Sequence, residues 1–232
     1  MKPRIAIIAA LPREVATLVE GWQDESDLAR KICIYTSDAA IAVCAGMGAA
    51  RAELAVQQAL ARGPVSYIFS VGWAGALKPE ISAGSVHHPA YVVDALTRQK
   101  FAAVAGTGTL VTVGNVANAE EKKALAAQFD ADFVDMEAAI VARLAAEQGI
   151  PFAVVKAISD EQDEALPEIA KFTTKDGWVR ESAFALHVAL RPWTWLATLR
   201  AARGASTSAR NLCRELHSIL LAYQANAKGQ EG

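Results

Sequence analysis

The sequence predicts an α/β protein whose central sheet is mixed, mainly parallel and covered by helices on both faces. Residues 5–10, 65–71 and 152–158 are continuous apolar runs of strand length, which is typical of strands buried on both sides. Helical segments separate these runs, and alternation of strands with helices favours parallel pairing in one sheet. The 232 residues, 53% of them apolar, are enough for one large domain or two small ones.

The first half of the chain predicts two strand-loop-helix units. After the first strand, Pro12 opens a predicted helix that extends to Trp22 with its apolar residues on one side. Two short strands follow within residues 32–44, and the glycines of residues 46–48 lead into a second helix. The strand at residues 65–71 then stops at a glycine-rich loop.

The second half continues the alternation. Its predicted strands cover residues 86–93, 110–113, 132–134 and 152–158, and its predicted helices cover residues 120–129 and 136–148. Ligands of such sheets bind beyond the carboxyl ends of the strands. We expect four distant segments to meet at that edge: Glu14, residues 72–75, residues 135–137 and residues 159–160.

Residues 191–225 predict a basic helical C-terminal extension. Five arginines and no acid lie between Arg191 and Arg214, with Trp193 and Trp195 near the start. Gly204 and residues 206–208 are expected to break this segment into two helices. Two roles stay open: the extension packs on the core or on a partner subunit, or its tryptophans and arginines make a weak contact with a membrane surface.

The composition excludes several classes of function. Because 23 Lys and Arg stand against 25 Asp and Glu, no global positive field attracts nucleic acid. The three cysteines lie far apart without metal-ligand spacing, so we expect no metal site and a reducing, cytoplasmic environment. The run Ile5–Leu11 is too short for a signal peptide, and no run reaches the ~18 apolar residues of a membrane span.

Four motifs occur in a fixed order along the chain: IIAALPREV at residues 7–15, GWAGA at 72–76, VDMEA at 134–138 and VVKAISD at 154–160. In these motifs the chain resembles the purine nucleoside phosphorylase and methylthioadenosine/S-adenosylhomocysteine nucleosidase superfamily over about residues 4–165. The resemblance implies the three-layer fold of that superfamily, a single domain over residues 1–232, and cleavage of the N-glycosidic bond of a purine nucleoside. It also favours a homodimer or a larger homo-oligomer.

The resemblance assigns Asp160 as the general acid that protonates or hydrogen-bonds N7 of the leaving purine, with Ser159 helping to hold it. A base that departs with the bonding electrons needs a proton, and general acids contribute ~10²–10⁴ in rate. Such an aspartate must keep or share a proton near neutral pH, which apolar neighbours such as Ile158 favour. Taken alone, Ser-Asp after a strand is also typical of a helix N-cap.

The resemblance places Glu137 on the ribose hydroxyls, where its charge favours the oxocarbenium ion, and Met136 beneath the ribose. Glu137 also suits the first turn of a helix. Glu14 decides the reaction type, because the nucleosidase branch uses this glutamate to deprotonate the attacking water. Phosphorylases leave that space for phosphate, and Arg13, residues 46–48 and Arg51 keep phosphate open as a co-substrate. No other cofactor is expected.

Three departures from the family pattern concern the substrate. Trp73 stands where a small hydroxyl residue is usual, Lys156 replaces an arginine and loses its planar fork, and residues 112–118 offer no aromatic ring to adenine. The predicted substrate-binding residues besides Met136, Ser159, Trp73 and Lys156 are Met47, Gly72, Gly75, Asn115 and Val116.

These departures and the C-terminal segment resemble the hopanoid-associated phosphorylase branch, which is thought to act on a nucleoside whose 5′ carbon carries a polycyclic lipid. The leading hypothesis is hydrolysis of an adenine-type nucleoside with a modified 5′ position. The alternatives are phosphorolysis, including that of an adenosylhopane-type lipid nucleoside, and a nucleoside-binding protein that has lost catalysis.

Overall fold

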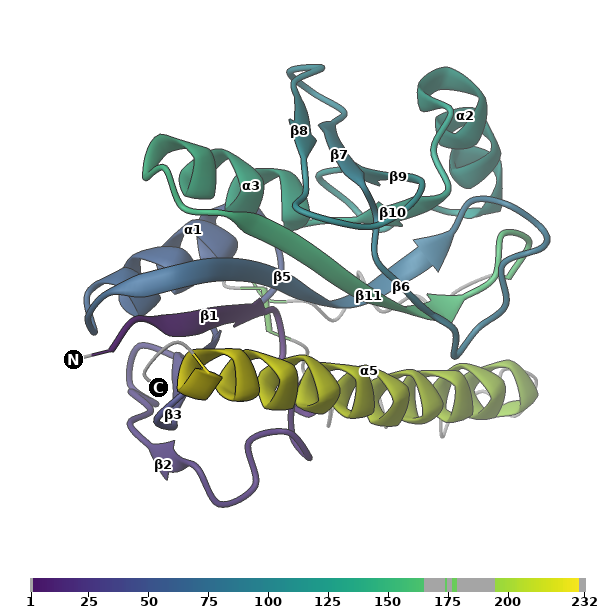
Figure 1. Ribbon diagram of the computed structural model, residues 1–232. Helices are drawn as coiled ribbons and strands as arrows, with labels where there is room; N and C mark the ends of the chain where they lie inside the picture. Colours follow the sequence, from purple (N-terminus) through teal and green to yellow (C-terminus); the bar gives the residue numbers. More distant parts are fainter. Residues whose placement is uncertain (1, 165–173, 175–176, 179–194, 230–232) are drawn as a thin grey trace.

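One mixed sheet forms the middle layer of the molecule (Figure 1). The computed structural model describes residues 2–164, 174, 177–178 and 195–229. Within them the strands are β1 (Arg4–Ala9), β2 (Gln23–Asp24), β3 (Cys33–Thr36), β4 (Ala40–Cys44), β5 (Val65–Ala76), β6 (Val86–His87), β7 (Tyr91–Asp94), β8 (Lys100–Ala102), β9 (Thr109–Thr112), β10 (Phe133–Asp135) and β11 (Phe152–Asp160).

The strand order is β2-β3-β4-β1-β5-β10-β9-β7-β8, with β11 beside β5 and β6 beside β11. The pairs β4-β1, β1-β5 and β5-β11 are parallel, while β5-β10 is antiparallel, so the sheet is mixed as predicted. Their continuous apolar sequences fit burial on both faces. The register of β11 on β5 sets Lys156 opposite Gly72 and Asp160 opposite Gly75.

Helices cover both faces of this sheet, which confirms the three-layer prediction. Helices α1 (Ala49–Leu60) and α3 (Ala138–Glu147) lie together on one face, and α5 (Trp195–Gly229) runs along β11 on the other (Figure 1). Helix α2 (Ala119–Phe129) packs near β9 and β10, and Asn118 caps its first turn.

The helix predicted from Pro12 to Trp22 is wrong. Only the 3₁₀ turn η1 (Pro12–Glu14) forms, and further turns follow it. The hydrogen bonds span three residues, as from Val15 N–H to the Pro12 carbonyl and from Leu18 N–H to the Val15 carbonyl, which tightens the chain beyond an α-helix. The apolar pattern still holds, because Val15 and Leu18 are buried.

Two strand boundaries also differ from the prediction. Strand β5 does not stop at Val71 but continues through the glycine-rich segment to Ala76, because β11 pairs with it there. The single strand predicted over residues 86–93 is two strands, β6 and β7, which Pro89 interrupts since proline has no N–H for the ladder. Strand β8 was not predicted.

Helix α5 is continuous, so the break predicted at Gly204 and residues 206–208 is wrong. Within the helix the Ser208 hydroxyl lies 2.8 Å from the Gly204 carbonyl of the preceding turn and 2.5 Å from the Ile158 carbonyl of β11, so this part of α5 is held against the sheet. Leu212 and Leu216 of the same helix are buried. The described part of the extension therefore packs on the core, whereas Trp193 and the side chain of Trp195 lie outside the described residues.

Candidate active site

Glu14 is held at the end of β1 by the turn to which it belongs. Its Oε2 accepts hydrogen bonds from the backbone N–H groups of Ala10 and Leu11, both at 2.9 Å, and its Oε1 accepts one from Trp73 at 3.3 Å. A Cβ atom on Gly72 would lie 3.0 Å from Glu14 Oε1, and Gly72 has a φ of +128°. Glycine is therefore needed in β5 for the buried carboxylate to lie against its backbone.

Three carboxylates and one ammonium form a group that we call the acidic cluster: Glu14, Asp135, Glu137 and Lys156. At its centre, Lys156 Nζ lies 2.8 Å from Asp135 Oδ2, and both side chains are buried. The Thr112 hydroxyl donates to Asp135 Oδ1 at 2.7 Å. The ends of β9 and β10 and the middle of β11 thus contribute to one polar site inside an apolar sheet.

Glu137 enters the cluster from the N-terminus of α3. Its Oε1 accepts a hydrogen bond at 2.7 Å from the N–H of Gly48, the residue before α1. Lys156 interacts electrostatically with Glu137 and Glu14 as well as with Asp135. One ammonium therefore serves three acids that lie far apart in the sequence.

Burial is the largest cause of the shifted pKa values of the two glutamates in the cluster. Burial raises the pKa of Glu14, against the opposing effects of backbone N–H groups and Lys156. Burial and the charge of Asp135 raise the pKa of Glu137 to about 7, although Lys156 and the Gly48 N–H oppose them. Burial alone would lower the pKa of Lys156, but the surrounding carboxylates raise it overall. The cluster is thus disposed to accept a proton or to stabilise a cation.

Asp160 lies at a second polar position, on the last residue of β11. It is 3% exposed. Its Oδ1 accepts a hydrogen bond from the Ser159 hydroxyl at 2.5 Å, and its Oδ2 accepts one from the ammonium of Lys122 in α2. A Cβ atom on Gly75 would lie 3.0 Å from Asp160 Oδ2, so glycine permits the close approach of β5 here as well.

The two polar positions lie along the same two paired strands, β5 and β11. Lys156 and Asp160 are four residues apart in β11 and pair with Gly72 and Gly75 of β5, with a register irregularity between Ile158 and Asp160. Glu14 and Asp160 both lie against β5, at Gly72 and Gly75 respectively.

The other predicted binding residues lie at varied positions. Met47 and Met136 are partly buried beside the loops that carry Gly48 and Glu137, and Trp73 is partly buried with Arg13 over its ring at 4.8 Å. Asn115 and Val116 are exposed in the segment between β9 and α2.

Arg51, a candidate phosphate ligand, binds backbone carbonyl groups instead. Its guanidinium contacts the carbonyl oxygens of Ala45 and of Lys31, the latter at 2.7 Å. The N-terminus of α1 gives its Gly48 N–H to Glu137. Arg51 and the Gly48 N–H therefore both bind groups of the protein itself.

Two buried residues of the site were not assigned roles from the sequence, Asp135 and Lys122. Asp135 stands beside Glu137 at the end of a predicted strand, and its place in that motif was the available signal. Lys122 lies three, four and seven residues before Leu125, Ala126 and Phe129, so it falls on the apolar side of α2. A lysine at such a position signals a buried partner.

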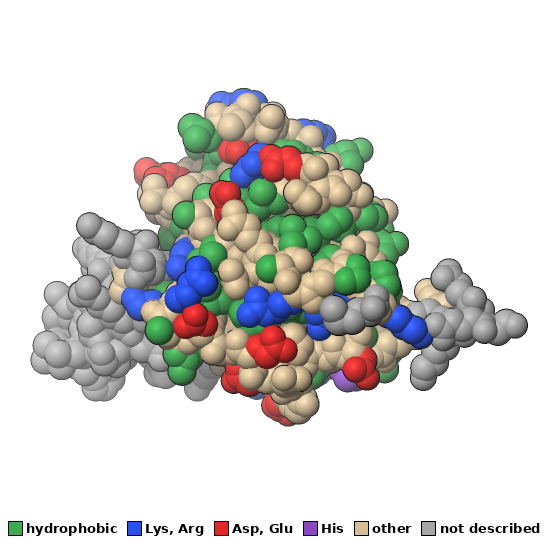
Figure 2. All heavy atoms as spheres, turned by 90° about the vertical axis from the view of Figure 1, so that its left-hand side faces the viewer, with side chains coloured by type: hydrophobic (Ala, Val, Ile, Leu, Met, Phe, Trp, Pro, Cys, Tyr) green, Lys and Arg blue, Asp and Glu red, His purple; other side chains and the backbone are tan. Residues whose placement is uncertain are grey.

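Other parts of the described chain show fewer features of a functional site. A groove of about 400 Å³ lies at the opposite end of β11, lined by Lys100–Val104, Ala142, Ala146 and Ile150–Phe152. Apolar and charged side chains are mixed on the side of the molecule that Figure 2 shows. Across the residues with described placement, no three His, Cys, Asp or Glu side chains are grouped to hold a metal ion. In the same part of the chain, no helix has the length and apolar character needed to cross a bilayer.

Comparison with protein families identifies a match to the model of the phosphorylase superfamily over residues 4–104 and 99–190. No curated protein matches the chain significantly.

Several solved structures have a similar fold. They include 5′-methylthioadenosine/S-adenosylhomocysteine nucleosidase from Helicobacter pylori, crystallised with butyl-thio-DADMe-Immucillin-A, with a TM-score of 0.72 at 16% identity over 96% of this chain and 99% of that one. Futalosine hydrolase of H. pylori gives 0.69 at 17% identity over 95% and 98%. Arabidopsis thaliana 5′-methylthioadenosine nucleosidase gives 0.70 at 17% identity over 95% of both chains. At these identities the likeness establishes the fold.

Proposed function

Because the chain belongs to the phosphorylase superfamily, we propose that it cleaves the N-glycosidic bond of a purine nucleoside by attack of water. The proposed substrate carries an adenine-type base and a modified 5′ position. The products are the free base and the ribose derivative. The reaction takes water as its co-substrate and needs no further cofactor.

The observation that carries this proposal is the place of Glu14 inside the acidic cluster. Three backbone N–H groups orient its carboxylate, and burial raises its pKa. A general base works best when its pKa approaches the operating pH, so this shift favours removal of a proton from water. An exposed glutamate in the first turn of a helix would show neither feature.

The rest of the cluster supports the sugar side of the reaction. Breaking the bond places positive charge on the ribose, and Glu137 and Asp135 supply negative charge close to Glu14. With a pKa of about 7, Glu137 can accept or donate a hydrogen bond to a ribose hydroxyl at neutral pH. Lys156 holds Asp135 in place and offsets part of the repulsion among the acids.

Asp160 supports the base side. Its position at the end of β11, on the same pair of strands as the acidic cluster and with Ser159 and Lys122 as donors, supports the proposal that it contacts the purine. The proposed role is transfer of a proton to N7 as the base leaves.

The charge of the cluster favours water over phosphate. Glu14, Asp135 and Glu137 outnumber Lys156 and Arg13, the cations that act on the cluster, so a phosphate dianion would bind there less well than water. Arg51, one of the cations that would attract phosphate, is engaged with backbone carbonyl groups.

We further propose that residues 1–232 form a single domain that includes α5. Buried contacts of Leu212 and Leu216 with the sheet support this, because removing α5 would expose one face of the core. A cytoplasmic location and a homo-oligomeric state are part of the same proposal.

The test is an adenine-release assay over methylthioadenosine, S-adenosylhomocysteine and a lipid-linked adenosine, with inosine to test the 6-oxopurine alternative. Each is measured with and without inorganic phosphate. We expect release of adenine at equal rates in both conditions. Dependence on phosphate with formation of a sugar 1-phosphate would establish phosphorolysis, and binding without release from any substrate would establish a non-catalytic protein.

A further inference from the structure

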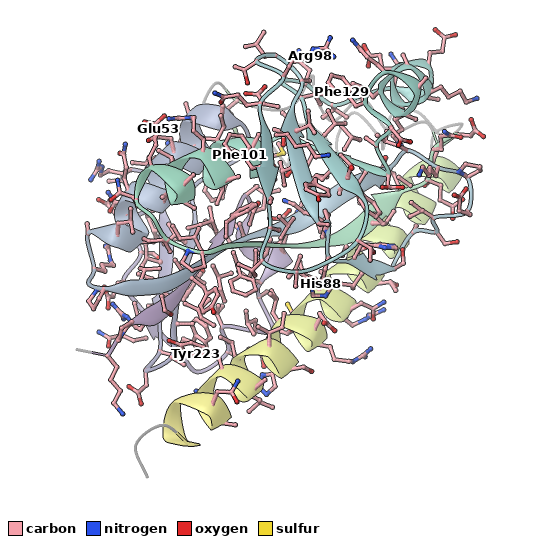
Figure 3. All side chains as sticks on the ribbon, turned by 45° about the horizontal axis from the view of Figure 1, so that its top comes forward. Glu53, His88, Arg98, Phe101, Phe129 and Tyr223 are labelled. Atoms are coloured by element: carbon pink, nitrogen blue, oxygen red, sulfur yellow. The ribbon has the colours of Figure 1, made fainter. Side chains whose placement is uncertain are left out.

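Lys122 is a buried cation to which the proposed mechanism assigns no chemical step. It is 1% exposed and shares the inner side of α2 with Leu125, Ala126 and Phe129. Phe129, labelled in Figure 3, lies at the last turn of this helix with the guanidinium of Arg98 4.5 Å from its ring centre. Burial of an ammonium is costly unless it is paired, so the contacts of Lys122 indicate its role.

The ammonium of Lys122 makes two contacts, and both are at the end of β11. It donates to Asp160 Oδ2, and it donates to the carbonyl oxygen of Glu161 at 2.6 Å. The Ser159 hydroxyl takes the other oxygen of Asp160. Each oxygen of Asp160 therefore accepts a hydrogen bond from the protein, which is the arrangement of an ionised carboxylate.

An ionised Asp160 lacks the hydrogen-bond donor that the leaving base needs. N7 of a purine accepts hydrogen bonds, and an ionised carboxylate can only accept as well. The base-side position needs one more proton than an isolated carboxylate would hold at neutral pH. The ammonium of Lys122, in direct contact with Asp160, is a group that can supply that proton.

We propose that Lys122 is a positioning residue for Asp160 that also holds the proton destined for the leaving base. The inference rests on the proposed function and deepens it. As the C1′–N9 bond breaks, its electron pair stays with the purine. The proton of Lys122 moves to Asp160, and Asp160 then passes a proton to N7. Water attacks C1′ and loses a proton to Glu14. After release of the base, Lys122 regains a proton from solvent and Glu14 returns one, so protons balance over the cycle.

A competing role is purely structural, in which Lys122 only fastens α2 to the end of β11. The two roles differ in one respect: a proton held for Asp160 matters only while Asp160 can pass it on. A double-mutant cycle separates them, because an effect that acts through Asp160 vanishes once Asp160 is replaced.

The experiment measures adenine release from methylthioadenosine, or from whichever nucleoside the wild type cleaves, for Lys122→Met, Asp160→Asn and the double variant. We expect Lys122→Met to lower kcat by about 10²-fold in the wild-type background and by less than about threefold in the Asp160→Asn background. The matched control is Lys123→Met, which removes the neighbouring lysine, 58% exposed and paired with Asp163, and leaves kcat unchanged. Equal losses in both backgrounds would overturn the proposal.

A pH profile and a second variant complete the test. The ratio of wild-type to Lys122→Met activity should rise by at least about tenfold from pH 6 to pH 9, because the variant has to take the proton for the leaving base from solvent, where protons are scarcer at high pH. Lys122→Arg keeps a cation and a donor but does not release its proton, so it too should lose about 10²-fold while folding normally. Full activity of Lys122→Arg, or a ratio that does not change with pH, would contradict proton storage. Failure of the wild type to release any base would instead refute the proposed function.

Discussion

The two ends of the candidate site carry different balances of charge. At the acidic cluster, Glu14, Asp135 and Glu137 share the single ammonium of Lys156. At the other end, the carboxylate of Asp160 has an ammonium of its own. An excess of carboxylates favours removal of a proton from water and stabilises positive charge. A carboxylate paired with an ammonium favours donation of a proton. The reaction we propose builds positive charge on the sugar and negative charge on the base, so it uses both ends.

Removal of the base at the cluster is expected to have the largest effect. Glu14→Gln keeps the shape of the side chain but cannot accept a proton from water, so adenine release should fall by about 10³–10⁴-fold. Nucleoside binding, measured by calorimetry, should persist. Glu20→Gln, at an exposed position of the same segment, is the control and should be neutral. Loss of less than about tenfold for Glu14→Gln would remove Glu14 from the chemistry.

Replacement of Lys156, the cation shared by the acidic cluster, is expected to have the next largest effect. Lys156→Met leaves three carboxylates without their partner in a buried place and should lower the free energy of unfolding at pH 7 by about 3–5 kcal/mol. Urea unfolding measures this. The exposed Lys123, replaced by Met, should change it by no more than about 0.5 kcal/mol. Equal stability of the Lys156→Met and Lys123→Met variants would show that the acids of the cluster need no cation.

The sequence predicts the sheet well because buried parallel strands leave a clear pattern. Ile5–Ala10 and Phe152–Ile158 are apolar throughout, and both form central strands. The helix after Pro12 could not be excluded from the sequence, since the turns found there bury the same residues, Val15 and Leu18, as a helix would. The continuity of α5 through Gly204 depends on a contact of Ser208 with β11, which is tertiary and leaves no local signal.

The sequence predicts some residues of the candidate site but not their pairing. Its motifs predict that Glu14, Glu137 and Asp160 lie at one edge of the sheet, but they assign no role to Asp135 or Lys122. Which cation pairs with which acid depends on distances across the fold, as in the contact of Lys122 with Asp160 from 38 residues away.

The pH dependence of stability should reveal the excess of acid at the cluster. The pKa of Glu137 is about 7 in the folded protein against 4.5 as its ordinary value, so between these values the folded state binds more protons than the unfolded state. Stability is therefore highest below pH 4.5 with respect to this group and falls as the pH rises through 7, by about 3 kcal/mol in total. Urea unfolding at pH 5 and pH 8 measures the loss, and Glu137→Gln should reduce it. An equally steep loss in Glu137→Gln would assign the dependence to other groups.

The two glycines of β5 allow the smallest and most selective comparison. Gly72→Ala sets a methyl group 3.0 Å from Glu14 Oε1 at a φ of +128°, which side chains rarely adopt, and should cost about 1–2 kcal/mol of stability. Gly75→Ala sets one 3.0 Å from Asp160 Oδ2 and 3.2 Å from Lys122 Cε. Gly114→Ala, with open space around it, is the control in thermal unfolding.

Because the first methyl group meets the acidic cluster and the second meets the Asp160–Lys122 contact, their effects on catalysis should differ in kind. Gly72→Ala displaces the general base and should lower adenine release by a similar factor from pH 6 to pH 9. Gly75→Ala separates Asp160 from its proton source, so its loss should grow as the pH rises. If both variants showed the same pH dependence, the two ends of the site would not have the separate duties that their charges indicate.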